Sequence, residues 1–252
     1  MKISVITVCF NSEQTIADTL RSVDMQTGID LEHLIIDGAS SDSTLAIIAA
    51  HPQTWRHVVS ERDSGLYDAM NKGIALASGD VIGFINSDDF YASSDVLTMV
   101  ADAFGDPSLD ACYGDLCYVK KDRSESVVRY WRSSAFKPGL FRRGWCPPHP
   151  TLFIRRDLYT KFGAFDLTYR IAADMELMAR FMERHRINAL HLPKLFIKMR
   201  TGGASNNGIS GVVRQNLEIW RAMKVHDLRP SLFLFVTGKF LAKGRQFLSR
   251  PT

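Results

Sequence analysis

The stretch that decides the fold is Val81-Ile82-Gly83-Phe84-Ile85-Asn86-Ser87-Asp88-Asp89, an apolar run that ends in a polar and acidic cluster. Three earlier apolar runs, at residues 3–9, 34–36 and 57–60, also lead into polar or acidic residues. Segments with helical spacing separate the runs, and such alternation indicates right-handed crossovers and a mostly parallel sheet. Open α/β sheets bind ligands at the carboxyl ends of their strands. The sequence therefore predicts a Rossmann-like α/β domain flanked by helices, with a ligand site lined by carboxylates.

The chain has 252 residues, is 46% hydrophobic and carries a formal net charge of +4. This length is typical of one large domain, or of one domain with an elaborated C-terminal half. The small, dispersed positive excess gives no reason to expect nucleic-acid binding. After about residue 110 the pattern changes: strand-like runs at 113–120 and 127–131 predict a hairpin. A strand is expected at 151–154 and a helix at 174–185.

The expected location follows from cysteine usage and from the two ends of the sequence. The four cysteines form no Cys-x-x-Cys pair, which favours buried free thiols. The first residues lead directly into a strand without a signal-peptide pattern, so we expect a cytoplasmic protein. The apolar run at 232–236 is far shorter than the roughly 20 residues that span a bilayer. Interleaved Lys and Arg there suit the inner face of an anionic membrane, and packing on the domain or a dimer contact explains them equally well.

Several common α/β enzyme motifs are absent from the sequence. The first strand-to-helix turn, at residues 9–15, contains no glycine, whereas a dinucleotide site needs glycines there so that the backbone can approach the pyrophosphate. The sequence also lacks a P-loop, a His-Glu-x-x-His motif and a Gly-x-Ser-x-Gly elbow after a strand. These absences argue against dinucleotide oxidoreductases, P-loop enzymes, zinc proteases and α/β-hydrolases.

Six motifs in order resemble the inverting glycosyltransferases of family 2, of the bacterial polysaccharide-biosynthesis type. They lie at 5–11, 37–42, 61–73, 86–89, 165–166 with 172–174, and 202–205. The resemblance implies a GT-A fold with a nucleotide-sugar-binding half at 1–110 and an acceptor-binding half at 111–210. Residues 211–252 would then form a helical tail. Each motif alone is a weak signal, but their shared order is a strong one.

The resemblance implies a divalent cation, Mn²⁺ or Mg²⁺, held by Asp88 and Asp89, with His149 as a contact to the metal or the diphosphate. A structural or acceptor-contacting role is the alternative for His149. Such cations prefer oxygen ligands and often combine one or two carboxylates with substrate phosphates. A solvated turn that caps the next helix is the alternative for the two aspartates. Asn86 stands where the family often has a carboxylate, and Met70 stands where many relatives have an arginine. Binding of the cation then depends on Asp88 and Asp89.

The resemblance also assigns the donor and acceptor sides. Asp37 would accept a hydrogen bond from a uracil imide or from another base in that position, and a UDP-sugar is the favoured donor. A plain loop aspartate before glycine is the alternative for Asp37. The other nucleotide contacts would come from Cys9 and Asn11, mainly through their backbone, and from Asp63, Asn71, Lys72 and Asp88. Asp174 would be the general base that takes the proton of the acceptor hydroxyl in a single in-line displacement. A helix N-cap is the alternative role for Asp174, and Glu176 is a second candidate base.

The predicted function is therefore metal-dependent, inverting transfer of a hexosyl or N-acetylhexosaminyl group to a glycan or lipid-linked glycan. Two other functions remain open. Asn86 is compatible with a catalytically inactive scaffold that binds sugar nucleotides or glycans. A nucleotidyltransferase would also use carboxylates and a metal, but residues 8–15 lack the Gly-rich basic loop that it needs.

Overall fold

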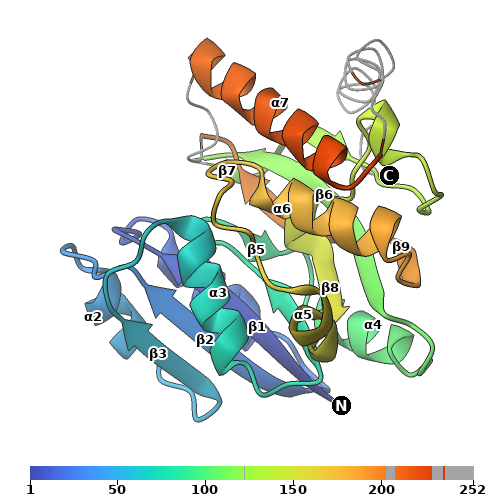
Figure 1. Cartoon of the computed structure of the whole chain (residues 1–252). Helices are drawn as coiled ribbons and strands as arrows, with labels where there is room; N and C mark the ends of the chain where they lie inside the picture. Colours follow the sequence, from blue (N-terminus) through green and yellow to red (C-terminus); the bar gives the residue numbers. More distant parts are fainter. Residues whose placement is uncertain (122, 203–207, 229–234, 236–252) are drawn as a thin grey trace.

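The computed structural model describes residues 1–121, 123–202, 208–228 and 235 (Figure 1). In this part of the chain one nine-stranded sheet has the order β3-β2-β1-β4-β8-β6-β9-β5, and β7 pairs with β6. The strands are β1 (Lys2–Cys9), β2 (Asp30–Asp37), β3 (Arg56–Ser60), β4 (Val81–Phe84), β5 (Phe90–Tyr91), β6 (Ala111–Lys120), β7 (Arg123–Trp131), β8 (Leu152–Arg155) and β9 (Ala189–Arg200).

The α-helices are α1 (Ile16–Asp24), α2 (Thr44–Ala49), α3 (Leu66–Leu76), α4 (Val96–Ala103), α5 (Arg156–Phe162), α6 (Ala173–Met178) and α7 (Gly208–Val225). Two short 3-10 helices, η1 (Phe141–Arg143) and η2 (His149–Thr151), lie in the second half. The helix predicted at 174–185 is an α-helix only as far as Met178 and continues as a π-helix, η3 (Ala179–Arg184). The apolar positions on its buried side fit either winding, so their spacing alone does not separate the two.

The first four strands confirm the predicted parallel sheet. β1 lies between β2 and β4 and runs parallel to both, and β2 pairs in parallel with β3. The predicted hairpin is also confirmed, because β6 and β7 are antiparallel neighbours. β8 pairs antiparallel with β4 and β6, so the sheet continues without interruption across residue 110. The two proposed halves therefore share one sheet.

Helices cover both faces of the sheet because alternate side chains of β1 point to opposite sides. Ile3 and Val5 pack in the same apolar cluster as α4, whereas Ile6 and Val8 pack in a cluster with α3, α5 and α6. Gly73 lets α3 approach β1 closely: a Cβ there would lie 2.5 Å from Cγ2 of Ile6. Figure 1 shows α3 across the parallel strands, and α7 beside α6 at one end of the molecule.

Two sequence features lie outside the described residues. These are the closing motif beyond Gly202 and nearly all of the basic, apolar tail at 232–250. Among the helices that the structure describes, none has the length and apolar character needed to cross a membrane.

Candidate active site

The predicted site begins where β1 and β2 end side by side. Cys9 and Asp37 are register partners, and the Cys9 thiol donates a long hydrogen bond of 3.5 Å to Oδ1 of Asp37. Burial, together with the charge of Asp37, raises the pKa of the Cys9 thiol. The thiol therefore stays protonated and is a poor nucleophile. The contribution of Cys9 at this edge is structural unless its backbone meets a ligand.

Asp37 is fully buried, and its carboxylate organises the loop that follows β2. Oδ2 accepts hydrogen bonds from the Ser40 amide at 3.0 Å and from the Ser60 hydroxyl at 2.6 Å, and the Ser40 hydroxyl donates to Oδ1. Burial alone would raise the pKa of Asp37, but the bonds from Ser40 and Ser60 outweigh it and lower the pKa. The carboxylate is therefore charged, and a nucleotide base would have to share its oxygens with these serines.

Asn11 and Asp63 shape the surface beside Asp37. Asn11 has a positive φ of 48°, and its side-chain oxygen accepts a 2.9 Å hydrogen bond from the Ser41 amide, which ties the first two loops together. Asp63 accepts a bond from the Gly65 amide at 2.9 Å. A Cβ on Gly38 would lie only 2.6 Å from Oδ2 of Asp63. Glycine at position 38 therefore lets the Asp63 carboxylate lie against the loop after β2.

Phe10 is a residue of this surface that sequence analysis missed. It is 63% exposed, and its ring lies against Gly38, 3.3 Å from the place that a Cβ there would take. An exposed aromatic ring at the carboxyl end of a parallel strand is a platform on which a base can stack. The signal in the sequence was available, because Phe10 is the last apolar residue before the polar turn.

Asp88 and Asp89 follow β4 in two different environments. Asp89 is fully buried, its Oδ2 accepts a 2.9 Å bond from the Asn86 amide, and its Oδ1 has no partner among the described residues. Asp88 is partly exposed, and its carboxylate forms no hydrogen bond to another side chain that the structure describes. Burial raises the pKa of both carboxyls, and for Asp89 the neighbouring charge of Asp88 adds to the effect.

This pair fits a hard divalent cation. A cation would satisfy the orphaned oxygen of Asp89 and the free carboxylate of Asp88, and would relieve their mutual repulsion. Within the described part of the chain no group of three or more His, Cys, Asp and Glu side chains forms a metal cluster. The remaining ligands would then be donor phosphates and water. Asn86 also finds a role, because its amide can donate to Asp89, which a carboxylate at that position could not do.

Arg200, at the end of β9, is a second residue that sequence analysis missed. Its guanidinium donates to the Asp88 carbonyl at 2.9 Å, forms an ion pair with Asp18 and lies 4.9 Å from the centre of the Phe90 ring. It thus fixes the backbone of the acidic turn from β9, the strand that pairs with β5 just after this turn. Nothing local in the sequence links it to Asp88, which is 112 positions away.

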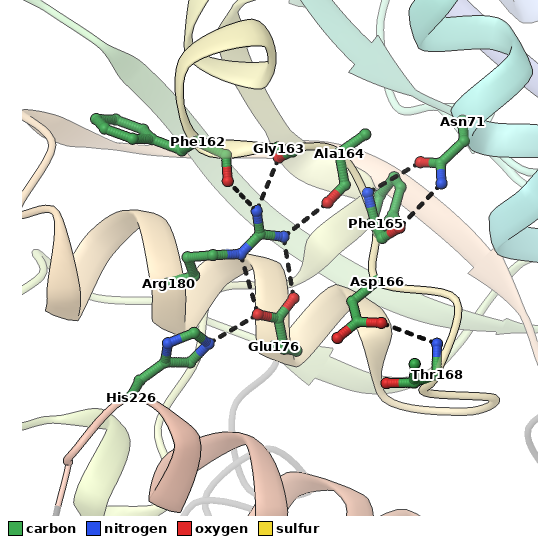
Figure 2. A network of polar contacts seen from close by, with 10 residues as sticks. All are labelled: Asn71, Phe162, Gly163, Ala164, Phe165, Asp166, Thr168, Glu176, Arg180 and His226. Atoms are coloured by element: carbon green, nitrogen blue, oxygen red, sulfur yellow. Dashed lines mark hydrogen bonds and ion pairs between the residues drawn. The ribbon is translucent and has the colours of Figure 1, made fainter.

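The helix α3 carries Asn71 and Lys72, but both side chains are engaged within the protein. Lys72 donates to the Arg62 carbonyl at 2.8 Å and forms an ion pair with Glu61, also at 2.8 Å. The Asn71 carboxamide forms two 2.9 Å bonds with the backbone of Phe165 (Figure 2). Lys72 therefore supports the loop at 61–65, and Asn71 supports the acceptor half.

Asp174 is partly exposed in the first turn of α6. It is not the N-cap residue, because that position is Ala172. Glu218 of α7 holds the segment just before the helix, where it accepts bonds from the backbone amides of residues 170, 171 and 172 at 3.2, 2.9 and 3.0 Å. Oδ1 of Asp174 accepts bonds from the Met175 amide at 2.8 Å and from the Tyr67 hydroxyl at 3.2 Å.

Glu176, the second candidate base, is buried in the network of Figure 2. It forms two 3.0 Å contacts with Arg180 and a 2.7 Å contact with His226. The same guanidinium donates to the carbonyls of residues 162, 163 and 164. Glu176 thus anchors the segment between α5 and α6, and its oxygens are occupied.

His149 lies near Asp174, in an aromatic cluster. Its ring stacks on Phe84, with centroids 5.5 Å apart, and meets the edge of Phe165 at 5.6 Å. Burial lowers the pKa of His149, and the negative charge of Asp174 opposes that effect. The ring is therefore neutral near pH 7 and could offer a nitrogen lone pair to a ligand. The structure thus gathers Cys9, Asn11, Asp37 and Asp63 at one part of the sheet edge, and Asp174 and His149 at another.

Comparison with known proteins gives a consistent picture. The family model described as Glycosyl transferase family 2 matches residues 4–165. An uncharacterized glycosyltransferase from Mycobacterium tuberculosis is 34% identical over 180 residues, which cover 71% of this chain and 68% of the relative. A PGL/p-HBAD biosynthesis glycosyltransferase from Mycobacterium bovis is 33% identical over 190 residues, or 70% of this chain and 68% of that protein.

Solved structures with the same architecture include TarS from S. aureus in complex with UDP-GlcNAc. It aligns with a TM-score of 0.70 and 20% identity, covering 98% of this chain and 72% of that one. The mannosyltransferase PcManGT from Pyrobaculum calidifontis, in complex with GDP-Man and Mn²⁺, aligns with a TM-score of 0.62 and 16% identity over 99% of this chain and 76% of that one. The likeness shows that the fold is their GT-A fold, as expected from the motifs.

Proposed function

The chain belongs to glycosyl transferase family 2 and is a glycosyltransferase, and on that premise we propose that it transfers a sugar from a nucleotide-diphosphate sugar to a hydroxyl of a glycan or lipid-linked glycan, with inversion. The observation that carries this proposal is the acidic turn after β4. There Asp88, a partly exposed carboxylate that accepts no hydrogen bond from any side chain the structure describes, adjoins the buried Asp89. This turn lies at the edge of the sheet where α/β folds bind nucleotides.

The proposed cation is Mn²⁺ or Mg²⁺, with Asp88 as its most accessible ligand and Asp89 as the second, and with donor phosphates and water completing its shell. His149 lies with Asp174 at the other part of the sheet edge, so we do not include it among the protein's metal ligands. When bound, such a cation neutralises the charge that develops on the leaving diphosphate. Support comes from the orphaned oxygen of Asp89 and from the Mn²⁺ in the complex of PcManGT. The Asn86 amide holds Asp89 in place.

The proposed donor site lies across the ends of β1 and β2. Phe10 would stack on the base, and Asp37, Asn11 and Asp63 would face its polar edge. Asn71 and Lys72 would contribute indirectly, by holding the backbone of Phe165 and of Arg62 in place. The donors bound to TarS and PcManGT carry different bases, so they support a nucleotide sugar in general. A UDP-sugar is the donor that we favour.

The proposed chemistry is one displacement. The acceptor oxygen forms a bond to the anomeric carbon while the bond from that carbon to the diphosphate oxygen breaks. The electron pair of the broken bond leaves with the nucleoside diphosphate. Asp174 takes the proton of the attacking hydroxyl, for which it needs an unprotonated carboxylate and access to the acceptor. Its partial exposure and its place at the start of α6 support this role.

We also propose a peripheral contact with the inner membrane face, which would bring a lipid-linked acceptor to the site. Val212, Val213 and Leu217 of α7 are 54%, 52% and 65% exposed, and apolar side chains on a basic helix suit a lipid interface. Co-sedimentation with phosphatidylglycerol vesicles, compared with phosphatidylcholine vesicles, tests it. Binding should require the anionic lipid and should weaken in V213E/L217E. Absence of binding to either vesicle would refute the contact.

The transfer activity is tested by incubating the protein with UDP-, GDP- and dTDP-sugars and Mn²⁺, and measuring the released nucleotide. Release from one donor, abolished by EDTA and restored by Mn²⁺, is the expected result. Metal-dependent stabilisation by a nucleotide diphosphate, without release from any donor even when glycan and lipid-linked acceptors are added, would instead favour the inactive scaffold. Release that persists in EDTA would contradict the metal role.

A further inference from the structure

Side chains of the motif at 61–73 form contacts on two faces of α3, and the proposed donor site does not explain the second of them. In α3, Asp68 and Lys72 turn toward the loop that precedes the helix: Asp68 accepts the Ser64 amide at 2.9 Å, and Lys72 donates to the Arg62 carbonyl. Tyr67 and Asn71, also spaced by four residues and hence on one face, turn toward the segment at 165–174. The second pair therefore connects the donor half to the segment that carries Asp174.

Tyr67 is the residue of this pair that reaches the Asp174 side chain. Its side chain is buried, and its ring lies 5.4 Å from the Phe165 ring, tilted by 32°. Its hydroxyl is a donor with two acceptors in reach, the Ile171 carbonyl at 2.8 Å and Oδ1 of Asp174 at 3.2 Å. Burial and the charge of Asp174 raise the pKa of Tyr67, so the hydroxyl keeps its proton wherever the protein is folded.

Several side chains hold the segment at 165–174, and most of them bond its backbone and not the Asp174 carboxylate. Asn71 fixes the backbone at Phe165, and Glu218 fixes the amides of residues 170–172. Among the side chains that the structure describes, only that of Tyr67 hydrogen-bonds to the Asp174 carboxylate. The Tyr67 hydroxyl faces both the Ile171 carbonyl and the Asp174 carboxylate. It therefore orients the carboxylate relative to the backbone just before the helix.

We propose that Tyr67 is a positioning residue for Asp174. It acts through that carboxylate, aiming its second oxygen toward the acceptor hydroxyl, and it does so from a helix of the donor half. The assignment rests on the proposed role of Asp174 as the general base. It goes beyond that role because it gives Tyr67, within the motif at 61–73, a function in the proton-transfer step.

The variant Tyr67→Phe tests this proposal, since it keeps the ring against Phe165 and removes only the hydroxyl. Tyr130→Phe is a matched control: Tyr130 is equally buried and donates a 3.0 Å bond to Oδ2 of Asp115. Asp115 also accepts the Ser133 amide and has no part in the proposed chemistry. The readouts are the rate of nucleotide release from the donor found in the screen, in Mn²⁺ and with water as acceptor, the dissociation constant of UDP with Mn²⁺, and the melting temperature.

We expect Tyr67→Phe to lower kcat by about tenfold to a hundredfold, the range for losing a hydrogen bond to a charged group. Its affinity for UDP should stay within about twofold, and its loss of melting temperature should match that of Tyr130→Phe, which keeps its kcat. In an Asp174→Asn background, Tyr67→Phe should cause no further loss. An unchanged kcat in Tyr67→Phe, or an equal loss in both backgrounds, would overturn the proposal.

A second measurement does not depend on turnover. Amide hydrogen exchange in peptides that cover residues 165–178 should speed up in Tyr67→Phe and stay unchanged in Tyr130→Phe. Unchanged exchange in Tyr67→Phe would also overturn the proposal. If Asp174→Asn keeps most of its activity while exchange changes as expected, the base assignment fails and the contact itself stands, so the two ideas fail separately.

Discussion

A buried glutamate at the amino ends of the strands gives a prediction about pH and stability. Glu32 of β2 is 5% exposed. It accepts hydrogen bonds from Ser4 of β1, from the amide and hydroxyl of Ser78, and from Lys2 at 3.2 Å. Burial by itself would raise its pKa, but these bonds outweigh it and lower the pKa from 4.5 to about 2. The carboxylate therefore stabilises the folded state when it is charged.

The sign of the effect follows from that shift. A carboxyl whose pKa is lower in the folded state contributes its full stability above the unfolded value of 4.5 and loses it as the pH falls toward about 2. The shift corresponds to at most about 3 kcal/mol. Because glutamine at this position can still accept some of the bonds, we expect Glu32→Gln to lower the free energy of unfolding by about 2 kcal/mol at pH 7.

Urea unfolding of the wild type and Glu32→Gln at pH 7, 5, 4 and 3 measures this difference. It should stay constant from pH 7 to 5 and shrink steadily below pH 4.5. Glu125→Gln is the control, since that side chain is 88% exposed and forms a loose ion pair with Lys198, 3.7 Å away. It should show little effect at any pH. A difference for Glu32→Gln that does not change between pH 7 and 3 would refute the reasoning.

Three further predictions concern the site. Asp174→Asn should reduce nucleotide release to a small residual rate and leave the affinity for UDP and Mn²⁺ unchanged by calorimetry. Asp88→Asn should instead lose the metal-dependent affinity, and the opposite pattern would exchange their roles. Phe10→Ala should weaken UDP binding by about 1–3 kcal/mol, the value of stacking a base on an aromatic ring, and unchanged affinity would remove Phe10 from the site. Arg180→Ala should lower the free energy of unfolding by about 3–5 kcal/mol, because it leaves the buried Glu176 carboxylate without the guanidinium and with His226 as its remaining partner. A loss below about 1 kcal/mol in urea would show that the pair is not needed.

Much of the site could be predicted because it depends on chain order. In a parallel sheet every strand delivers its next residue to the same edge, so the residues after apolar runs, such as Asp37 and Asp88, identify that edge without any knowledge of packing. The exposed Phe10 belongs to the same class and was open to the same argument. Arg200 was not, because it reaches the Asp88 backbone from β9 through a contact that spans 112 residues of sequence.

The roles inside the motif at 61–73 could not be predicted in the same way. Sequence spacing places Tyr67 with Asn71, and Asp68 with Lys72, on two faces of one helix. It does not say which face meets the donor side. The answer depends on how α3 packs on the sheet and on contacts to Phe165 and Asp174 that span 94 and 107 residues.

The sequence by itself determined the family, the parallel half of the sheet and the identity of the acidic turn at 86–89, because strand order, turn chemistry and strand-end position are local properties of the chain. Only the tertiary structure decided which carboxylates are free and which are occupied. Among the described residues Asp88 accepts no side-chain hydrogen bond, whereas Glu176 is surrounded by Arg180 and His226. The physical reason is that a carboxylate's availability depends on the donors that folding brings to it from distant segments, and a linear pattern does not contain their directions.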